Sequence, residues 1–422
     1  MTARLSRAVL AALVALALAP LAPAQAADPK PNLDAAASAI LIDARDGSVL
    51  LAKRPEAERS MASTTKLMTA LLTLERTEPD QVFTASGYRA APIESKISLR
   101  PGERMRVSDL FEGLMLESAN DAAVTLAEGI SGSRPAFVRD MNERAAALGL
   151  RHTRYSNPIG LDEGDNHSSA RDLAMLARRL MTNPRFAAVV RQPSAVLESG
   201  ARRRVVNNRN DLVGRYPYVK GVKTGRTREA GYVLVGAASN AAGARVISVV
   251  MGTPSESARD ATSLALLQYG LKQFQRRKVL DADTPVASAK VEYRDERTEL
   301  VPRSDLLVLA RRGEKVRTRV DAPEELGETP AGRRVGTIAV LREGKVIDRV
   351  PLVTAAEVPG TGPLRRLVNA LGGVVPLVLI LVFISVIVVV AVRQRSRRRE
   401  RERAERRRAR NRARARAEGQ IE

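Results

Sequence analysis

Three short polar motifs are spaced along the chain in an order that suits acyl-transfer chemistry. They are Ser63-Thr64-Thr65-Lys66, Ser118-Ala119-Asn120 and Lys223-Thr224-Gly225. A serine hydroxyl becomes a nucleophile when a base takes its proton, and a lysine is such a base when its surroundings keep it neutral. Ser63 and Lys66 are three residues apart at the expected start of a helix, so they lie on one face within reach of each other. The motifs together predict a serine enzyme whose base is a lysine.

The surroundings of Lys66 decide whether it can act as that base. The positive end of the helix dipole and partial burial both disfavour the charged ammonium form, and Lys223 is a second cation that would act in the same direction. Each motif also has an ordinary structural explanation. The first would be a helix cap with a surface lysine, the second an N-cap at Asn120 or Asp121, and the third an ordinary lysine at a strand turn. In the functional interpretation the third motif ends an apolar strand, where the missing side chain of Gly225 lets a substrate backbone approach.

An α+β fold is predicted to position these motifs. Apolar runs at 38–44 and 48–53 flank an Asp-Gly pair, which indicates an early hairpin. Residues 75–102 contain three prolines and are expected to form a loop. The periodicity predicts helices from about 63 and over 107–116, 122–129, a segment opened by Ser133, 168–181 and 258–274, and late strands over 216–223, 231–238 and 244–251. We therefore expect one largely antiparallel sheet built from distant segments.

The composition argues against several other chemistries. The chain has 422 residues and no cysteine, so it has no disulfide, thiolate nucleophile or cysteine metal site. Only His152 and His167 could serve as imidazole bases or metal ligands. We therefore expect no metal centre, no cofactor and no histidine-based triad.

Both ends of the chain predict export and membrane attachment. Residues 1–27 combine two arginines, an apolar run and Ala24-Gln25-Ala26, which is the pattern of a cleavable signal peptide. Residues 371–392 are uncharged and would span about 33 Å as a helix, enough to cross a bilayer. The last thirty residues, 393–422, hold 14 arginines and five glutamates, and so carry +9 of the total charge of +22. This basic tail predicts a cytoplasmic C-terminus and a catalytic domain on the cell-wall side of the membrane.

The remaining segments give the domain organisation. The catalytic domain is predicted over 28–280, a small β-rich domain over 281–358 and a linker over 359–370. The basic tail is interpreted first as a solvated determinant of topology. It would also suit anionic lipid head groups, at about 1 kcal/mol per basic residue near the surface. No nucleic-acid partner is expected, because the tail has no aromatic residue to stack on bases.

Taken together, the three motifs resemble those of the penicillin-recognising serine enzymes. The neighbouring residues are similar to those of the D-alanyl-D-alanine carboxypeptidases, the low-molecular-mass penicillin-binding proteins. These stretches are Met61–Ala70, Ser118–Ala123, Ala170–Ala174 and Lys223–Thr227. The resemblance covers residues 35–275 strongly, and it implies a β-lactamase/penicillin-binding-like domain in which helices flank an antiparallel sheet.

The resemblance also implies an activity and a role for the first two motifs. Ser63 would attack the penultimate D-alanine carbonyl of a peptidoglycan stem peptide and release the terminal D-alanine through an acyl-enzyme. Lys66 would accept the Ser63 proton, and Ser118 would pass a proton to the leaving amine. Asn120 would hold Lys66 or the substrate amide.

Substrate binding is implied for the third motif and for nearby arginines. The implied set is Lys223, Thr224, Gly225, Arg226, Arg209 and Arg259. Lys223 and Thr224 would contact the terminal carboxylate of the substrate, with Arg209 and Arg259 near it. The backbone amides of Ser63 and Arg226 would form the oxyanion hole. Arg226 stands where many relatives have histidine, which would alter specificity more than chemistry because only its amide is needed.

β-Lactam antibiotics are the implied inhibitors, because they would acylate Ser63. The alternatives are a β-lactamase or a D,D-endopeptidase of the same superfamily, and a catalytically silent scaffold that binds the cell wall. The rate at which the acyl-enzyme is hydrolysed separates the carboxypeptidase from the β-lactamase. The intact motif residues argue against the scaffold.

Overall fold

The computed structural model describes residues 28–418, so the predicted signal peptide lies outside the described residues. The chain forms two compact units. The first ends at Arg276 and also includes the short segment Leu309–Arg312, whereas the second consists of Arg277–Val308 and the residues from Gly313 onward. Each unit has its own apolar core.

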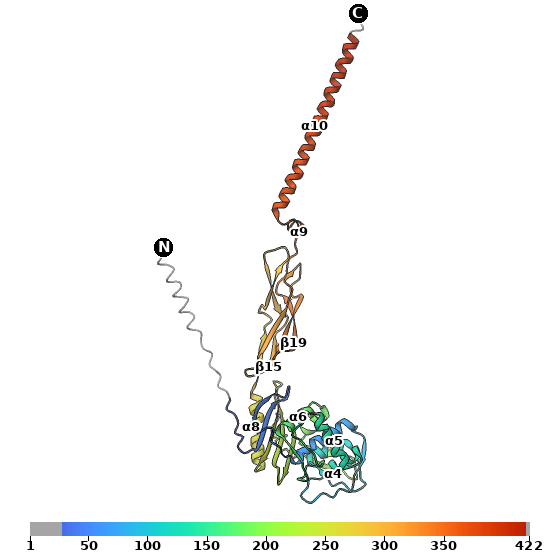
Figure 1. The fold of residues 1–422 in the computed structure, drawn as a ribbon, viewed down its shortest axis with the longest axis vertical. Coiled ribbons are helices and arrows are strands. Elements are labelled where there is room, and N and C mark those ends of the chain that lie inside the picture. The colour runs from blue at the N-terminus through green and yellow to red at the C-terminus, as the bar shows by residue number, and fades with distance from the viewer. Residues whose placement is uncertain (1–27, 419–422) are drawn as a thin grey trace, which may run out of the picture. The chain divides into compact units, whose positions relative to one another are not determined.

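A five-stranded antiparallel sheet organises the first unit, as predicted (Figure 1). Its strand order is β2-β1-β11-β10-β9. The strands are β1 (Ser38–Asp43), β2 (Val49–Lys53), β9 (Val219–Thr227), β10 (Gly231–Ser239) and β11 (Arg245–Thr253). The early hairpin thus lies beside strands some two hundred residues later, with Ile40 opposite Val249.

Alternating side chains of this sheet enter two different cores. Leu41 and Val250 face helix α8 (Glu256–Lys272), which covers one side. Ile40 and Val249 belong to the larger core, which contains helix α6 (Ala170–Leu180) and the rest of the helical layer. The sheet is therefore buried on both faces, with one helix on one side and several on the other.

The helical layer contains the segments that carry the first two motifs. Its further helices are α2 (Lys66–Arg76), α3 (Val107–Glu112), α4 (Asn120–Ser131), α5 (Arg134–Ala147) and α7 (Pro184–Val190). Short paired strands connect them: β3 (Arg59–Ser60) with β6 (His167–Ser168), β4 (Val82–Thr84) with β5 (Arg104–Arg106), and β7 (Ser194–Leu197) with β8 (Arg204–Asn207). Ser133 begins α5 as predicted, because its hydroxyl accepts the N–H of Ala136.

Two local predictions were wrong. The expected loop at 75–102 contains strand β4, which is stabilised by pairing with β5. The Lys223-Thr224-Gly225 motif lies in the middle of β9 rather than at its end. The strand continues to Thr227 because β10 pairs with it along the whole motif, with Gly231 opposite Thr227.

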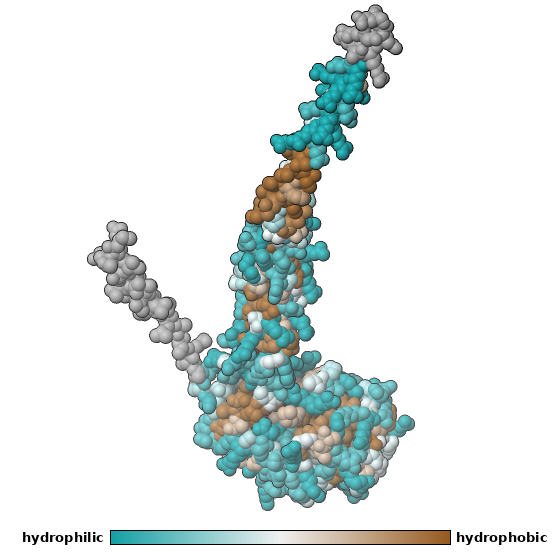
Figure 2. Space-filling view, turned by 45° about the horizontal axis from the view of Figure 1, so that its top comes forward, coloured by the Kyte–Doolittle hydropathy of each residue, from teal (hydrophilic) through white to brown (hydrophobic). Residues whose placement is uncertain are grey.

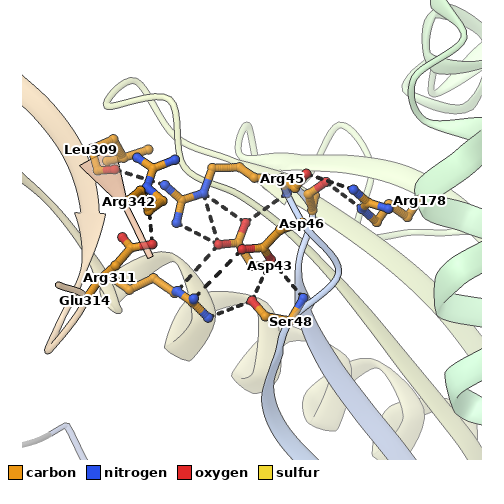
Figure 3. Close-up of polar contacts among 10 residues, drawn as sticks. Asp43, Arg45, Asp46, Ser48, Arg178, Leu309, Arg311, Glu314 and Arg342 are labelled. Atoms are coloured by element: carbon orange, nitrogen blue, oxygen red, sulfur yellow. Dashed lines mark hydrogen bonds and ion pairs between the residues drawn. The ribbon is translucent and has the colours of Figure 1, made fainter. Parts of the chain in front are cut away.

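A polar cluster at the β1–β2 turn holds the segment Leu309–Arg312 within the first unit (Figure 3). Asp43 is fully buried and accepts hydrogen bonds from the guanidinium of Arg45, at 2.7–3.1 Å. Arg45 also donates to the Leu309 carbonyl at 2.9 Å, and Arg311 donates to the Ser48 hydroxyl at 2.6 Å. These contacts fix a part of strand β15 (Leu306–Arg311), which pairs with β12 (Phe274–Leu280).

A six-stranded sheet organises the second unit, in the order β16-β18-β19-β14-β13-β17. Its strands are β13 (Ala287–Val291), β14 (Arg297–Pro302), β16 (Val316–Asp321), β17 (Glu325–Leu326), β18 (Arg334–Arg342) and β19 (Lys345–Thr354). Ile338, Val340, Val350 and Leu352 lie in its core. This unit is β-rich as the sequence predicts.

Helices replace strands in the last part of the chain. α9 (Pro363–Ala370) lies within the predicted linker, and α10 (Val374–Glu418) follows after a turn at Gly372 and Gly373. The part of α10 from Val374 to Val392 is uncharged and apolar, whereas the part from Arg393 to Glu418 is hydrophilic (Figure 2). By length and composition α10 is a candidate membrane span, and it begins three residues later than predicted.

Candidate active site

The first motif forms a tight turn before helix α2. Residues Ala62–Thr65 make a 3-10 turn, and α2 begins at Lys66. Ala62 has a φ of +48°, a left-handed conformation that costs free energy in a residue other than glycine. Between Met61 and Lys66 only Ser63 is not fully buried. The turn therefore presents one hydroxyl to the surface from an otherwise closed segment.

Lys66 lies next to this hydroxyl in a fully buried position. Its Nζ is 3.0 Å from Ser63 Oγ and donates a hydrogen bond to the Ile159 carbonyl at 2.6 Å. Burial lowers the pKa of Lys66 well below its usual value, and the nearby Lys223 lowers it further. The expected second cation is thus present, and the structure favours the neutral amine that a base requires.

The second motif follows a π-helical turn, η2 (Gly113–Glu117), which continues α3. Ser118 is buried in the left-handed conformation, with φ +63° and ψ +30°. Asn120 is the first residue of α4, and its Nδ2 donates to Glu94 Oε2 at 2.6 Å. The predicted cap was wrong: Ala119 occupies the N-cap position of α4. The Asn120 and Asp121 side chains bond to the loop at 94–99, and Asp121 Oδ1 also accepts the Ala122 N–H at 3.0 Å.

The third motif places a second buried lysine on β9. Lys223 Nζ donates to the Thr224 carbonyl at 2.9 Å. Burial, followed by the charges of Arg209 and Arg259, lowers the pKa of Lys223 to about 7. Arg209 and Arg259, which are distant from this motif in sequence, are therefore close enough to Lys223 to lower its pKa. Arg259 is almost fully buried and pairs with Asp260 at 2.8 Å.

Gly225 packs against the turn that carries Ser63. A Cβ at Gly225 would lie 3.0 Å from both the Ser63 backbone nitrogen and the Ala62 Cβ. The missing side chain thus makes room for the Ala62–Thr65 turn, and the approach of a substrate backbone to Gly225 stays a prediction. Its neighbour Arg226 is exposed, and its guanidinium lies 5.2 Å from the centre of the Tyr232 ring.

Sequence reasoning missed two groups that contact the motif residues. Glu94 and the carbonyl of Ile159 bond to Asn120 and Lys66 respectively. Neither belongs to a motif with a recognisable spacing, and both come from irregular segments. Only the folding of these segments onto α2 and α4 brings them to the site.

The described part of the chain, residues 28–418, contains no group of three or more His, Asp or Glu side chains suited to a metal ion. His152 bonds to Glu58 at 3.1 Å and His167 to Asp165 at 2.7 Å. The contact between Ser63 Oγ and the buried Lys66 Nζ, whose neutral form burial favours, is suited to proton transfer from the serine to the lysine.

Comparisons with known proteins agree with this chemistry. The family model for D-alanyl-D-alanine carboxypeptidases matches residues 24–255, and that for the C-terminal domain of penicillin-binding protein 5 matches residues 274–360. The D-alanyl-D-alanine carboxypeptidase DacF of Bacillus subtilis is 31% identical over 353 residues, which cover 80% of this chain and 89% of that protein. DacA of Escherichia coli is 34% identical over 346 residues, covering 78% and 85%.

Solved structures show the same likeness. Penicillin-binding protein 5 from Haemophilus influenzae is 30% identical and matches with a TM-score of 0.57, over 79% of this chain and 100% of that one. The fold is like that of penicillin-binding protein 5, and the family match defines a serine hydrolase. Within this class, the chain belongs to the D-alanyl-D-alanine carboxypeptidase family.

Proposed function

We propose that this protein removes the terminal D-alanine from peptidoglycan stem pentapeptides through an acyl-enzyme at Ser63. The observation that carries the proposal is the 3.0 Å contact between the Ser63 hydroxyl and a buried Lys66 whose charged form is disfavoured. The names of its relatives supply the substrate class.

In the first half-reaction the Ser63 proton moves to Lys66 as Oγ attacks the penultimate D-alanine carbonyl. The N–H groups of Ser63 and Arg226 stabilise the negative oxygen of the tetrahedral intermediate. The peptide bond then breaks, and Ser118 passes a proton to the leaving amine of D-alanine. Water subsequently hydrolyses the ester and restores the Ser63 hydroxyl.

Lys223 and Thr224 are proposed to bind the terminal carboxylate of the substrate. The positive field of Arg209 and Arg259, which lowers the pKa of Lys223, attracts the same carboxylate. A β-lactam carries a carboxylate beside a strained amide, so the same residues would direct it to Ser63 as an acylating inhibitor. Asn120 is proposed to hold Lys66 or the substrate amide.

The location is also part of the proposal. The apolar half of α10 would cross the cell membrane once, with the catalytic unit on the cell-wall side and the arginine-rich tail in the cytoplasm. Export would depend on the predicted signal peptide at 1–27. The tail would bind anionic lipid head groups at the inner surface.

The test uses the full-length protein in detergent with a peptide ending in D-Ala-D-Ala. Release of D-alanine is expected, as is labelling by fluorescent penicillin that disappears in Ser63→Ala. No release at high enzyme concentration would contradict the proposal. Rapid loss of the label would indicate a β-lactamase, and cleavage of cross-linked peptides would indicate an endopeptidase.

A further inference from the structure

The loop at residues 94–99, which carries none of the three motifs, is hydrogen-bonded to the start of α4. The Asn120 N–H donates to the Ser95 carbonyl at 2.8 Å. The Asp121 carboxylate accepts the N–H groups of Ile97 and Leu99 at 3.1 and 2.9 Å. The segment 94–99 therefore forms part of the support of the second motif, although it lies about twenty residues before that motif in sequence.

Glu94, at the start of this segment, is held by three donors. The Tyr88 hydroxyl donates to Oε2 at 2.5 Å, the Asn120 Nδ2 donates to the same oxygen at 2.6 Å, and the Ala91 N–H donates to Oε1 at 2.8 Å. Burial raises the pKa of Glu94, but these hydrogen bonds outweigh it and keep the pKa below its usual value. Glu94 is therefore an ionised carboxylate with a fixed orientation.

An ionised carboxylate can only accept hydrogen bonds, whereas an amide side chain has one donating and one accepting end. Contact with Glu94 thus requires the Asn120 NH2 group, and it leaves Oδ1 as the group that can accept a further bond. An acceptor is what the active site needs there, either for the Lys66 ammonium formed during acylation or for a substrate N–H. With the amide reversed, Oδ1 would face the Glu94 carboxylate, so that two acceptors would meet. At the other end, the NH2 group would face the Lys66 ammonium or the substrate N–H, so that two donors would meet.

We propose that Glu94 is a positioning residue for acylation, which fixes the Asn120 amide with its oxygen available to Lys66 or to the substrate. This inference rests on the proposed function of Ser63 and Lys66. It assigns a role in the chemistry to a loop that carries none of the three motifs.

Glu94 also contributes to the electrostatics of Lys66. Burial and Lys223 lower the pKa of Lys66, whereas the carboxylates of Glu94 and Asp121 raise it. Loss of the Glu94 charge would therefore lower this pKa further, so that the neutral base would form at a lower pH. A residue with a merely structural role would not move this pH dependence.

The experiment compares Glu94→Gln with Glu163→Gln in the full-length protein. Glu163 is an exposed carboxylate whose charge also acts on Tyr88, but within the described residues the Asn120 side chain bonds to Glu94 and not to Glu163. The second-order rate of acylation by fluorescent penicillin is measured from pH 5 to 9. A glutamine at 94 can present either end of its amide, so E94Q is expected to slow acylation about ten- to hundredfold and to shift its acid limb to lower pH. E163Q should change the rate less than about twofold.

Glu94→Asp keeps a carboxylate and should recover part of the lost rate. If the acylation rate constant of E94Q and the acid limb of its pH profile both equal those of the wild type, the inference is overturned. If E94Q does not fold, Tyr88→Phe replaces it, since this variant loosens Glu94 but keeps its charge. Slower acylation of Tyr88→Phe, with the acid limb of its pH profile at the wild-type position, would then support the inference. Acylation of this variant at the wild-type rate would overturn it. Failure of penicillin to label wild-type Ser63 would instead overturn the proposed function, and this inference with it.

Discussion

At the scale of single residues, two buried lysines of the same site have different protonation requirements. In the proposed reaction Lys66 must be neutral to take a proton, and its burial beside Lys223 favours the neutral form. In the same proposal Lys223 must be charged to attract a carboxylate, yet burial and the charges of Arg209 and Arg259 lower its pKa to about 7. The two requirements are satisfied together only within a range of pH.

We therefore expect a bell-shaped pH dependence of kcat/KM for D-alanine release. Below the pKa of Lys66 the base is protonated, and above about pH 7 the free enzyme loses the Lys223 charge. Lys223→Arg keeps its charge at every pH tested, because a guanidinium does not titrate there. Its alkaline limb should therefore disappear between pH 5 and 10. Identical alkaline limbs in the wild type and the variant would contradict the assignment.

At the scale of elements, the packing of β9 against the nucleophile turn positions the site. The turn contains a strained residue, Ala62, and packs closely against the backbones of Gly225 and Gly160. A Cβ at Gly160 would lie 2.1 Å from the Ala62 carbonyl oxygen. Gly160 therefore leaves no space for a side chain, and a Cβ at Gly225 fits only if the turn shifts by a few tenths of an ångström.

Gly225→Ala tests this packing. The added methyl group would require the Ser63 N–H to shift by a few tenths of an ångström. Because a displacement of about 1 Å can reduce a rate about a hundredfold, this smaller shift should slow acylation by roughly two- to tenfold. Overpacking should also destabilise the fold by about 1–3 kcal/mol. The measurements are penicillin acylation and urea unfolding. Gly87→Ala is the control, because its Cβ would enter open space; equal acylation rates in the two variants would refute the packing argument.

A buried ion pair, Arg204 with Glu103, holds the loop at 94–99 from its C-terminal side. Arg204 donates to Glu103 at 2.7 and 3.0 Å and to the Ile97 carbonyl at 2.8 Å, and both charged side chains are nearly inaccessible. Glu103→Ala would leave an unpaired buried guanidinium and should lower the free energy of unfolding by about 3–5 kcal/mol.

The matched control is Glu198→Ala, which removes an exposed pair with Arg203. Its cost should be at most about 1 kcal/mol. Urea unfolding of both variants measures the difference. Equal stabilities would mean that the buried pair does not hold the loop.

At the scale of the whole molecule, the absence of cysteine gives a direct test of topology. Ala356→Cys introduces a thiol before α9, and Ala404→Cys introduces one in the arginine-rich half of α10. In intact cells a membrane-impermeant maleimide should label the first and not the second, while lysed cells should show both. Labelling of position 404 in intact cells would reverse the proposed orientation.

The agreement between sequence and structure follows from the range of the interactions involved. Hydrophobic periodicity predicted the early hairpin, the late strands and most helices, because alternation and helical spacing reflect local burial. It did not locate the end of β9, since the pairing of Thr227 with Gly231 extends the strand through polar residues. It also missed β4, whose partner β5 lies some twenty residues later.

The candidate chemistry could be predicted from local patterns, because the order of three motifs, the lack of cysteine and the scarcity of histidine pointed to lysine as the base. Local spacing also predicted that Lys66 lies within reach of Ser63, because residues three apart on a helical turn share a face. The surroundings of that pair could not be predicted in this way. Burial, the charge of Lys223 and the bonds from Ile159 and Glu94 come from segments distant in sequence, and no local pattern records a contact that forms only when those segments pack together.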